Sequence, residues 1–272
     1  MIPNVLSIAG SDPSGGAGVQ ADLKAISANG AFAMAALTAL TAQNTQGVSG
    51  IHFVPPAFVQ SQIDTVFDDI RVDAVKIGMI GNAEIAQAVA RALAGRKTTI
   101  ILDPVMIAKG GAALLQPDAV VVMRDVLLPM ATVLTPNLPE AAHLLETDLA
   151  TTRDKMASQG RALCALGPAA VLMKGGHLSS SDSPDCLVTG DSATWFEGPR
   201  TPTPNTHGTG CTLSSALAAQ LANTDDIHAA VATAKSYVAS AIACADQLSV
   251  GSGHGPTHHF ANLYASHKET SL

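Results

Sequence analysis

Residues 205–212, Asn-Thr-His-Gly-Thr-Gly-Cys-Thr, stand directly before an apolar helical pattern at 213–221. Gly208, Thr209 and Gly210 would leave backbone N–H groups at the helix N-terminus, where these groups and the helix dipole bind anions. A transferring phosphoryl group is one such anion. An ordinary capped helix start has the same composition, so the segment alone leaves both interpretations open.

Cys211 falls in the first turn of this predicted helix. The helix field lowers the pKa of a thiol there and favours the thiolate, which can accept a proton from a substrate hydroxyl. The alternative is a buried and inert cysteine.

Three charged residues follow predicted strands and could serve phosphoryl transfer. Asp103 and Glu140 could hold Mg²⁺, which proteins bind through one or two carboxylates and substrate phosphates. Lys174 precedes a glycine pair and could reach a phosphate. Taken singly, an Asp-Pro turn and a carboxylate facing a helix dipole are the commoner explanations of Asp103 and Glu140. A solvated lysine at a strand end is the alternative for Lys174.

Two further side chains could recognise a flat heterocycle. The amide of Gln43 offers one donor and one acceptor, as an aminopyrimidine edge requires. Met79 could lay its thioether against an aromatic ring, although a core methionine is commoner. The glycine-rich loop 10–18 is not a P-loop, because Gly16 stands where the nucleotide-binding lysine would be, and a tight turn is its simpler explanation. His254, His258 and His259 lack further ligands at metal-binding spacing, which favours a loop and a helix start.

These residues require a scaffold that brings strand ends together. Short apolar runs alternate with helical patterns, which predicts an α/β fold with a mainly parallel sheet covered by helices, whose ligands gather at the carboxyl ends of the strands. The predicted strands are 5–9, 74–77, 99–102, 132–134 and 171–173, with a hairpin over 186–197 around Gly190 and Asp191. The predicted helices are 18–28, 57–70, 82–94, 139–145, 153–165, 212–221 and 225–245.

The length and charge limit the remaining possibilities. The chain has 272 residues, a net charge of −7 and no basic cluster, which argues against a nucleic-acid surface and favours one domain over 1–272. No apolar run is long enough for a membrane helix, and no signal sequence begins the chain, so we expect a cytoplasmic location. The four cysteines form no CxxC pair, so neither a zinc site nor a disulfide framework is predicted.

Taken together, the motifs resemble those of the hydroxymethylpyrimidine/phosphomethylpyrimidine kinases of thiamine biosynthesis, in the ribokinase superfamily. The resemblance runs nearly end to end and rests on the order of its motifs, which are 9–24, 43–45, 76–79, 103–106, 135–140, 174–177, 207–212 and 253–256. It implies a three-layer α/β/α ribokinase-like fold, usually a homodimer, in which ATP, Mg²⁺ and a small pyrimidine alcohol meet above the sheet.

The resemblance also implies residue roles. The catalytic set is Gly208, Thr209, Gly210, Cys211 and Lys174; the nucleotide contacts are Lys174, Asn137 and Thr209; the metal ligands are Asp103 and Glu140; and the pyrimidine contacts are Gln43, Asp22, Met79, Val105 and the backbone of Gly10 and Ala17. Residues 109–111 would form a flap.

Three questions stay open at this point. Many superfamily members have Asp where this chain has Cys211, so the thiol either takes the proton or only positions the hydroxyl. The family also implies a second phosphorylation, of the monophosphate to the diphosphate, which spacing and composition do not show. A pyridoxine or pyridoxal kinase of the same superfamily, or a non-catalytic vitamin-binding module, would keep much of the same pattern.

Overall fold

A single sheet of nine strands runs through the protein in the computed structural model, which describes residues 1–107, 111, 114–179 and 181–264. Its spatial order is β3-β2-β1-β4-β5-β6-β7-β8-β9. The strands are β1 (Asn4–Ser11), β2 (Phe32–Asn44), β3 (Gly47–Phe53), β4 (Ala74–Ile77), β5 (Thr99–Leu102), β6 (Val133–Leu134), β7 (Ala170–Lys174), β8 (Asp185–Thr189) and β9 (Ser192–Phe196). Strands β2, β1, β4, β5, β6 and β7 pair in parallel, while β3, β8 and β9 add antiparallel edges.

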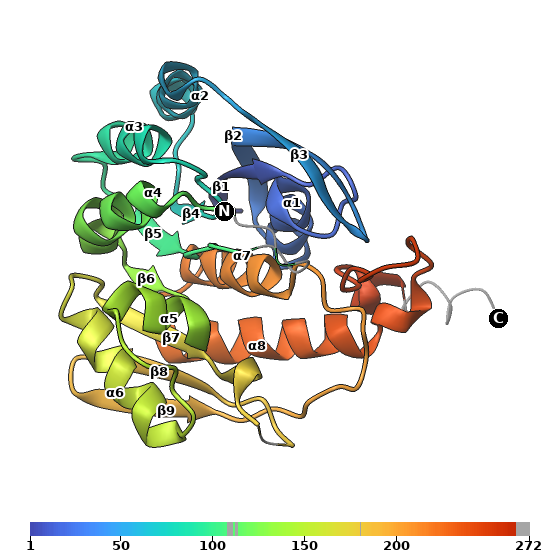
Figure 1. Ribbon diagram of the computed structural model, residues 1–272. Coiled ribbons are helices and arrows are strands. Elements are labelled where there is room, and N and C mark those ends of the chain that lie inside the picture. Colours follow the sequence, from blue (N-terminus) through green and yellow to red (C-terminus); the bar gives the residue numbers. More distant parts are fainter. Residues whose placement is uncertain (108–110, 112–113, 180, 265–272) are drawn as a thin grey trace.

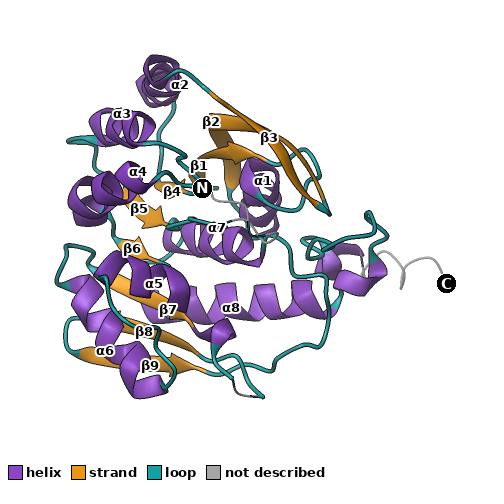
Figure 2. Cartoon of the chain, in the orientation of Figure 1, coloured by secondary structure: helices purple, strands orange, loops and turns teal. Residues whose placement is uncertain are grey.

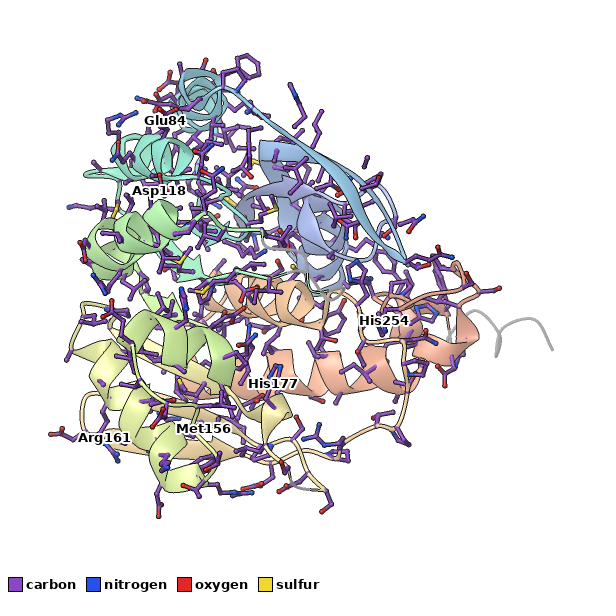
Figure 3. The ribbon with its side chains drawn as sticks, in the orientation of Figure 1. Glu84, Asp118, Met156, Arg161, His177 and His254 are labelled. Atoms are coloured by element: carbon purple, nitrogen blue, oxygen red, sulfur yellow. The ribbon has the colours of Figure 1, made fainter. Side chains whose placement is uncertain are left out.

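Helices cover both faces of this sheet, which makes the predicted three layers (Figure 1). One layer contains α2 (Pro56–Asp69), α3 (Ala83–Leu93), α4 (Pro117–Val122), α5 (Leu138–Leu145) and α6 (Arg153–Cys164). The other contains α1 (Gly18–Ala28), α7 (Thr209–Leu221) and α8 (Ile227–Ala243). In Figure 3, Glu84 marks α3, Asp118 marks α4, and Met156 and Arg161 mark α6.

The alternation of side chains along each strand explains the two apolar cores. In β4, Val75 and Ile77 enter the core under α2 to α6, while Ala74 enters the core under α1, α7 and α8. Because successive strand residues face opposite sides, Lys76 also faces α1 and α7. A lysine therefore lies inside the second layer, fully buried.

The predicted elements are confirmed with shifts of one to three residues at most ends. The hairpin is present as β8 and β9, joined at Gly190, whose φ of 56° a glycine tolerates best. Strands β2 and β3 and the helix α4 were not predicted. Strand β2 is rich in alanine and leucine, which favour helices, and its parallel pairing with β1 overrides that preference.

Within the described residues, no helix is both long and apolar enough to cross a lipid bilayer. The predicted flap over 109–111 lies mostly outside the described residues. Figure 2 shows the strands passing between the two helical layers, and the carboxyl ends of the parallel strands share one edge. That edge is where the predicted functional residues meet.

Candidate active site

The carboxyl ends of β5 and β7 bring Asp103 and Lys174 into contact beside the start of α7. Lys174 Nζ donates to Asp103 Oδ1 at 2.8 Å. A Cβ atom placed on Gly210 would lie 3.3 Å from Lys174 Nζ and 3.6 Å from Asp103 Oδ2. The lysine, the aspartate and the helix N-terminus predicted for phosphoryl transfer therefore form one cluster.

Burial and charge set the protonation of this pair. Burial alone would raise the pKa of Asp103, but the positive charges of Lys174 and Lys76 outweigh it and lower that pKa. Burial alone would lower the pKa of Lys174, but Asp103 and then Glu140 raise it. Both groups are charged at neutral pH, and the ammonium is available to a phosphate at the site edge.

Glu140 and Asn137 form a capping box at the start of α5. The Asn137 side chain accepts from the Glu140 backbone N–H at 2.8 Å, and Glu140 Oε2 accepts from the Asn137 backbone N–H at 2.8 Å. Glu140 Oε2 also lies 3.8 Å from Lys174 Nζ. Burial raises the pKa of Glu140 to about 7, although Lys174 acts in the opposite direction. Glu140 therefore caps the helix, as its alternative interpretation predicted. The side-chain oxygen of Asn137, a predicted nucleotide contact, already accepts a hydrogen bond within this cap.

The oxygen donors at this edge suit a hard cation such as Mg²⁺, which commonly takes one or two carboxylates and completes its shell with phosphates and water. Asp103 and Glu140 supply two such carboxylates on either side of Lys174. Among the described residues, no group of three His, Cys, Asp or Glu side chains gathers to make a closed metal cage. The donor set fits an ion that arrives with nucleotide phosphates.

The N-terminus of α7 has the geometry expected of an anion-binding turn. Gly208 is the N-cap residue with φ 76°, and the helix begins at Thr209, three residues earlier than predicted. The first N–H groups of a helix have no partner within the helix. Gly208 also touches the first glycine loop so closely that a Cβ would collide with the Gly16 carbonyl.

The expectation that the helix field makes Cys211 a thiolate is wrong. Burial raises the pKa of its thiol to about 11, and the lowering effect of Lys76 does not compensate, while Asp22 and Asp103 raise it further. The desolvation of a charged sulfur outweighs the helix dipole here. A neutral thiol at neutral pH supports the second alternative, in which Cys211 positions the hydroxyl.

The predicted heterocycle contacts come from β1, β2, the loops after β4 and β5, and the start of α1. Met79 is buried, and its sulfur lies against Gly10, where an added Cβ would be 3.0 Å away. Val105 is partly exposed beside Asp103. The Ala17 backbone N–H already donates to the Asp12 carboxylate at 2.8 Å, so this group is not free to bind a substrate as predicted.

Asp22, also predicted to contact the pyrimidine, is enclosed by protein. Its side chain has 0% exposure and accepts from Ser7 Oγ at 2.6 Å, from Ser215 Oγ at 2.8 Å and from Lys76 Nζ at 2.9 Å. A substrate has no access to these oxygens in this structure, because the side chain is fully buried. The structure therefore replaces the predicted contact with a buried ion pair. A lysine within an apolar four-residue strand was the signal for it, because a buried charge requires a partner.

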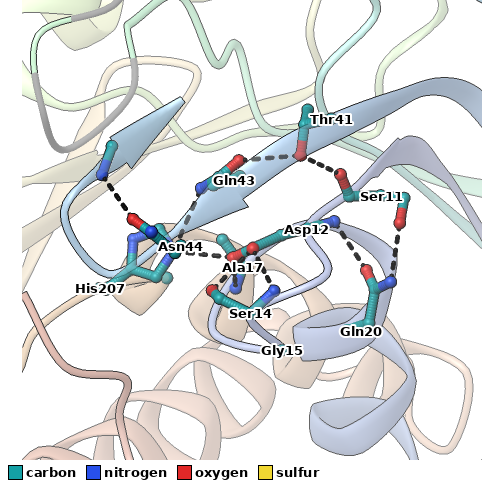
Figure 4. Close-up of polar contacts among 12 residues, drawn as sticks. Ser11, Asp12, Ser14, Gly15, Ala17, Gln20, Thr41, Gln43, Asn44 and His207 are labelled. Atoms are coloured by element: carbon teal, nitrogen blue, oxygen red, sulfur yellow. Dashed lines mark hydrogen bonds and ion pairs between the residues drawn. The ribbon is translucent and has the colours of Figure 1, made fainter. Parts of the chain in front are cut away.

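Asp12 and His207 make a further contact between an acidic and a basic side chain that the sequence analysis did not assign, and it joins the two glycine-rich loops (Figure 4). Asp12 Oδ2 lies 2.8 Å from His207 Nε2, and Asp12 Oδ1 accepts from the hydroxyl and backbone of Ser14. His207 Nε2 is also 3.5 Å from Gln43 Nε2. Because His207 directly precedes Gly208, this pair places Gln43 next to the anion-binding turn.

Of the three C-terminal histidines, His258 and His259 are buried, whereas His254 is exposed and contributes a backbone contact. The His254 backbone N–H donates to the Thr45 carbonyl at 2.8 Å, and His259 Nε2 lies 3.0 Å from Thr212 Oγ1. Burial lowers the pKa of His259 to about 4, so its ring is neutral. Figure 3 shows His254 in the segment after α8, well apart from His177. The predicted loop is confirmed, and it closes over the start of α7.

Asp12→Asn is expected to lower the free energy of unfolding by about 2 kcal/mol at pH 7, because charged hydrogen bonds of this kind contribute about 1.5–3 kcal/mol. Burial would raise the pKa of Asp12, but His207 and Ser14 hold it below the ordinary 3.8. A carboxyl with a lowered folded pKa stabilises the protein above its unfolded pKa, and this contribution is lost as pH falls through the folded pKa. Urea unfolding between pH 7 and pH 3 measures the difference.

The control for this experiment is Asp68→Asn, at an exposed position of α2. It is expected to change stability by less than about 0.5 kcal/mol at every pH. A deficit of Asp12→Asn that stays constant down to pH 3 would contradict the assigned contact between the Asp12 carboxylate and His207.

Comparison with known proteins identifies the family of this chain. The phosphomethylpyrimidine kinase family model matches residues 12–258. The chain is 52% identical over 258 residues to the hydroxymethylpyrimidine/phosphomethylpyrimidine kinase of Escherichia coli (strain K12), covering 94% of this chain and 97% of that protein. It is 43% identical over 262 residues to the kinase of the same name from Bacillus subtilis (strain 168), covering 96% of each.

Solved structures agree with the fold. The ADP complex of Bacillus subtilis pyridoxal kinase superposes with a TM-score of 0.88 at 34% identity, covering 97% of this chain and 100% of that chain. The phosphomethylpyrimidine kinase from Clostridium difficile 630 superposes with a TM-score of 0.77 at 40% identity, covering 87% and 97%. By its sequence, its ribokinase-like fold and the cluster at the start of α7, the chain belongs to the phosphomethylpyrimidine kinase family.

Proposed function

We propose that this protein transfers the γ-phosphoryl group of ATP to the hydroxymethyl group of 4-amino-5-hydroxymethyl-2-methylpyrimidine, and then phosphorylates the monophosphate to the diphosphate, in thiamine biosynthesis. The observation that carries the proposal is the junction of Lys174, Asp103 and Gly210 at the N-terminus of α7. Relatives of about 50% identity over nearly the whole chain bear the corresponding name. We further propose that residues 1–272 act as one catalytic domain.

The proposed reaction is an in-line attack of the hydroxymethyl oxygen on the γ-phosphorus, without a covalent phosphoenzyme. Lys174 and the backbone N–H groups of residues 208–211 would stabilise the negative charge that develops on the phosphoryl oxygens. Cys211, with its neutral thiol, would orient the hydroxyl, whose proton leaves late in a loose transition state. Thr209 donates its hydroxyl to the Thr206 carbonyl and so helps to hold the turn.

Magnesium belongs to the proposal as well. Asp103 and Glu140 would hold the ion, which supplies charge neutralisation at the nucleotide phosphates. The nucleotide contacts proposed with it are Lys174, the amide nitrogen of Asn137 and the turn at Thr209. A homodimer and a cytoplasmic location, which the family resemblance implies, complete the proposal; sedimentation of the purified chain tests the former.

Gln43 is proposed to read the aminopyrimidine edge, with Met79 and Val105 against the ring. We expect Gln43→Ala to raise the KM for the pyrimidine on the order of 100-fold, because a polar edge loses both of its hydrogen-bond partners. The turnover number should change much less, since Gln43 would contact the pyrimidine edge and not the transferring phosphoryl group in this scheme. Steady-state kinetics with varied pyrimidine measures both constants.

Gln87→Ala, on the exposed side of α3, is the matched control and should leave both constants unchanged. An unaltered KM in Gln43→Ala would exclude Gln43 from substrate recognition.

The decisive assay offers the purified chain hydroxymethylpyrimidine and pyridoxine separately, with ATP and Mg²⁺, and resolves the products by mass. Pyrimidine mono- and diphosphate would support the proposal. Pyridoxine phosphate alone would move the substrate to the vitamin B6 branch, to which the pyridoxal kinases of similar fold belong. If neither compound gave a product, the non-catalytic vitamin-binding module would remain as the alternative.

A further inference from the structure

The buried ion pair of Lys76 and Asp22 lies under the phosphoryl-transfer site and is not used by the reaction as described above. Lys76 Nζ donates to both oxygens of Asp22 at 2.9 Å, and both side chains have 0% exposure. Burying two charges is costly, and such a pair often stabilises a protein less than apolar residues of similar size would. The surroundings of the pair indicate a role beyond stability.

The pair connects four elements of the fold. Ser7 on β1 stands beside Lys76 on β4 in the parallel register, and its hydroxyl donates to Asp22 Oδ2 at 2.6 Å. Asp22 lies on α1, and Ser215 on α7 donates to Asp22 Oδ1 at 2.8 Å. The carboxylate of Asp22 is thus the point where two strands and two helices are joined by polar contacts.

Two consecutive serines of α7 contact two different acid–lysine pairs, one serine to each pair. Ser214 Oγ lies 3.2 Å from Asp103 Oδ2, in the pair with Lys174 at the transfer site. Ser215 Oγ contacts Asp22, in the pair with Lys76. The first turns of α7 are therefore held at two separate points, and both points are ion pairs.

The second of these points bears directly on Cys211. Residues four apart share one face of a helix, so Ser215 lies one turn below Cys211 on the same side of α7. A Cβ on Gly78 would lie 2.6 Å from Lys76 Nζ, so the ammonium reaches the carboxyl end of β4. Two of its three protons go to Asp22, and the structure gives the third no hydrogen-bond acceptor among the described residues.

We propose that Lys76 is a positioning residue for phosphoryl transfer, which acts through Asp22 and Ser215 to hold the first turns of α7, and with them Cys211 and the anion-binding turn, in the reactive position. The electrostatics agree with this arrangement. Burial alone would lower the pKa of Lys76, but Asp22, followed by Cys211 and Asp103, raises it, so the ammonium stays charged. The inference rests on the proposed kinase function.

The test compares Lys76→Met, Asp22→Asn and the double variant. Each single variant leaves a buried group without its partner and is expected to lower the Tm by about 10 °C. The double variant removes both charges and should recover most of that loss. Its kcat should nevertheless stay on the order of 100-fold below wild type, the size expected when reacting groups are displaced by about 1 Å, while both KM values stay within about threefold.

A purely structural pair predicts the opposite result, in which kcat recovers together with the Tm in the double variant; that outcome would overturn the proposal. Ser215→Ala provides an independent variant that keeps the ion pair and removes only its contact with α7. We expect its kcat to fall about tenfold, while its Tm falls by only several degrees, less than in the single charge variants, because only one hydrogen bond to a charged group is lost. Ser240→Ala on α8, whose hydroxyl contacts the exposed Asn262, is the control and should keep wild-type kcat.

Hydrogen exchange separates this inference from the proposed function. The amides of residues 208–213 should exchange faster in Ser215→Ala and in the double variant than in wild type, with or without substrate. If the wild-type protein did not phosphorylate the pyrimidine, the proposed function would be refuted. The hydrogen-exchange rates at 208–213 would still test the positioning role. Unchanged exchange at 208–213 together with wild-type kcat in Ser215→Ala would refute the positioning role.

Discussion

Lys174→Met is expected to lower kcat on the order of 1000-fold, the upper range for removal of one group that stabilises transition-state charge. The Lys174 ammonium is the cation that contacts Asp103 and approaches Glu140 beside the start of α7. Its loss also leaves Asp103, which is 1% exposed, without its closest partner. We therefore expect a simultaneous loss of about 3 kcal/mol in the free energy of unfolding.

Kinetics with saturating ATP and pyrimidine, paired with urea unfolding, separate the two effects. Lys155→Met, at an exposed position of α6, removes the same charge from the surface and should leave both kcat and stability within error of wild type. If Lys174→Met were fully folded at the assay temperature and kept more than a tenth of wild-type kcat, its role in phosphoryl transfer would be wrong.

Gly208→Ala is expected to lower kcat on the order of 100-fold, because the added methyl group would push the anion-binding turn away from the first glycine loop. Two costs combine at this position. The φ of 76° is unfavourable for any residue with a Cβ, by about 1 kcal/mol. In addition, the new Cβ would collide with the Gly16 carbonyl, and backbone is harder to displace than a flexible side chain.

Gly30→Ala separates these two costs. Gly30 has φ 82°, and a Cβ there meets nothing within 4 Å. This variant should lose about 1 kcal/mol of stability through φ alone and keep its kcat. Equal kcat in the two variants would show that the contact between residues 16 and 208 does not position the anion-binding turn.

Several features of the fold could be predicted because they depend on local patterns. The parallel core strands and most helices follow from apolar runs and helical spacing, and the hairpin of β8 and β9 follows from the Gly190 turn. Strand β2 could not be predicted in this way, since its alanines and leucines suit a helix equally well. Its strand conformation depends on backbone pairing with β1, a partner more than twenty residues away.

In the candidate site, too, some features could be predicted from local sequence patterns and others could not. The clustering of Asp103, Lys174 and the α7 N-terminus follows from their places at the carboxyl ends of parallel strands of one sheet and before a helix. The pKa of Cys211, by contrast, could not be predicted from the sequence. The sequence shows a cysteine in a first helical turn, but the desolvation that raises its pKa depends on how much protein surrounds the sulfur.

The order of residues by itself therefore determined the α/β class, the family and the residues available for phosphoryl transfer, because these depend on periodicity and on motifs of adjacent residues. Only the tertiary structure decided that Asp22 is paired with Lys76 instead of facing a ligand, and that Asp12 binds His207 across 195 positions. The physical reason is that burial and the choice of an ionic partner are properties of three-dimensional surroundings. A charged side chain enclosed by protein must bind whichever opposite charge the fold brings to it.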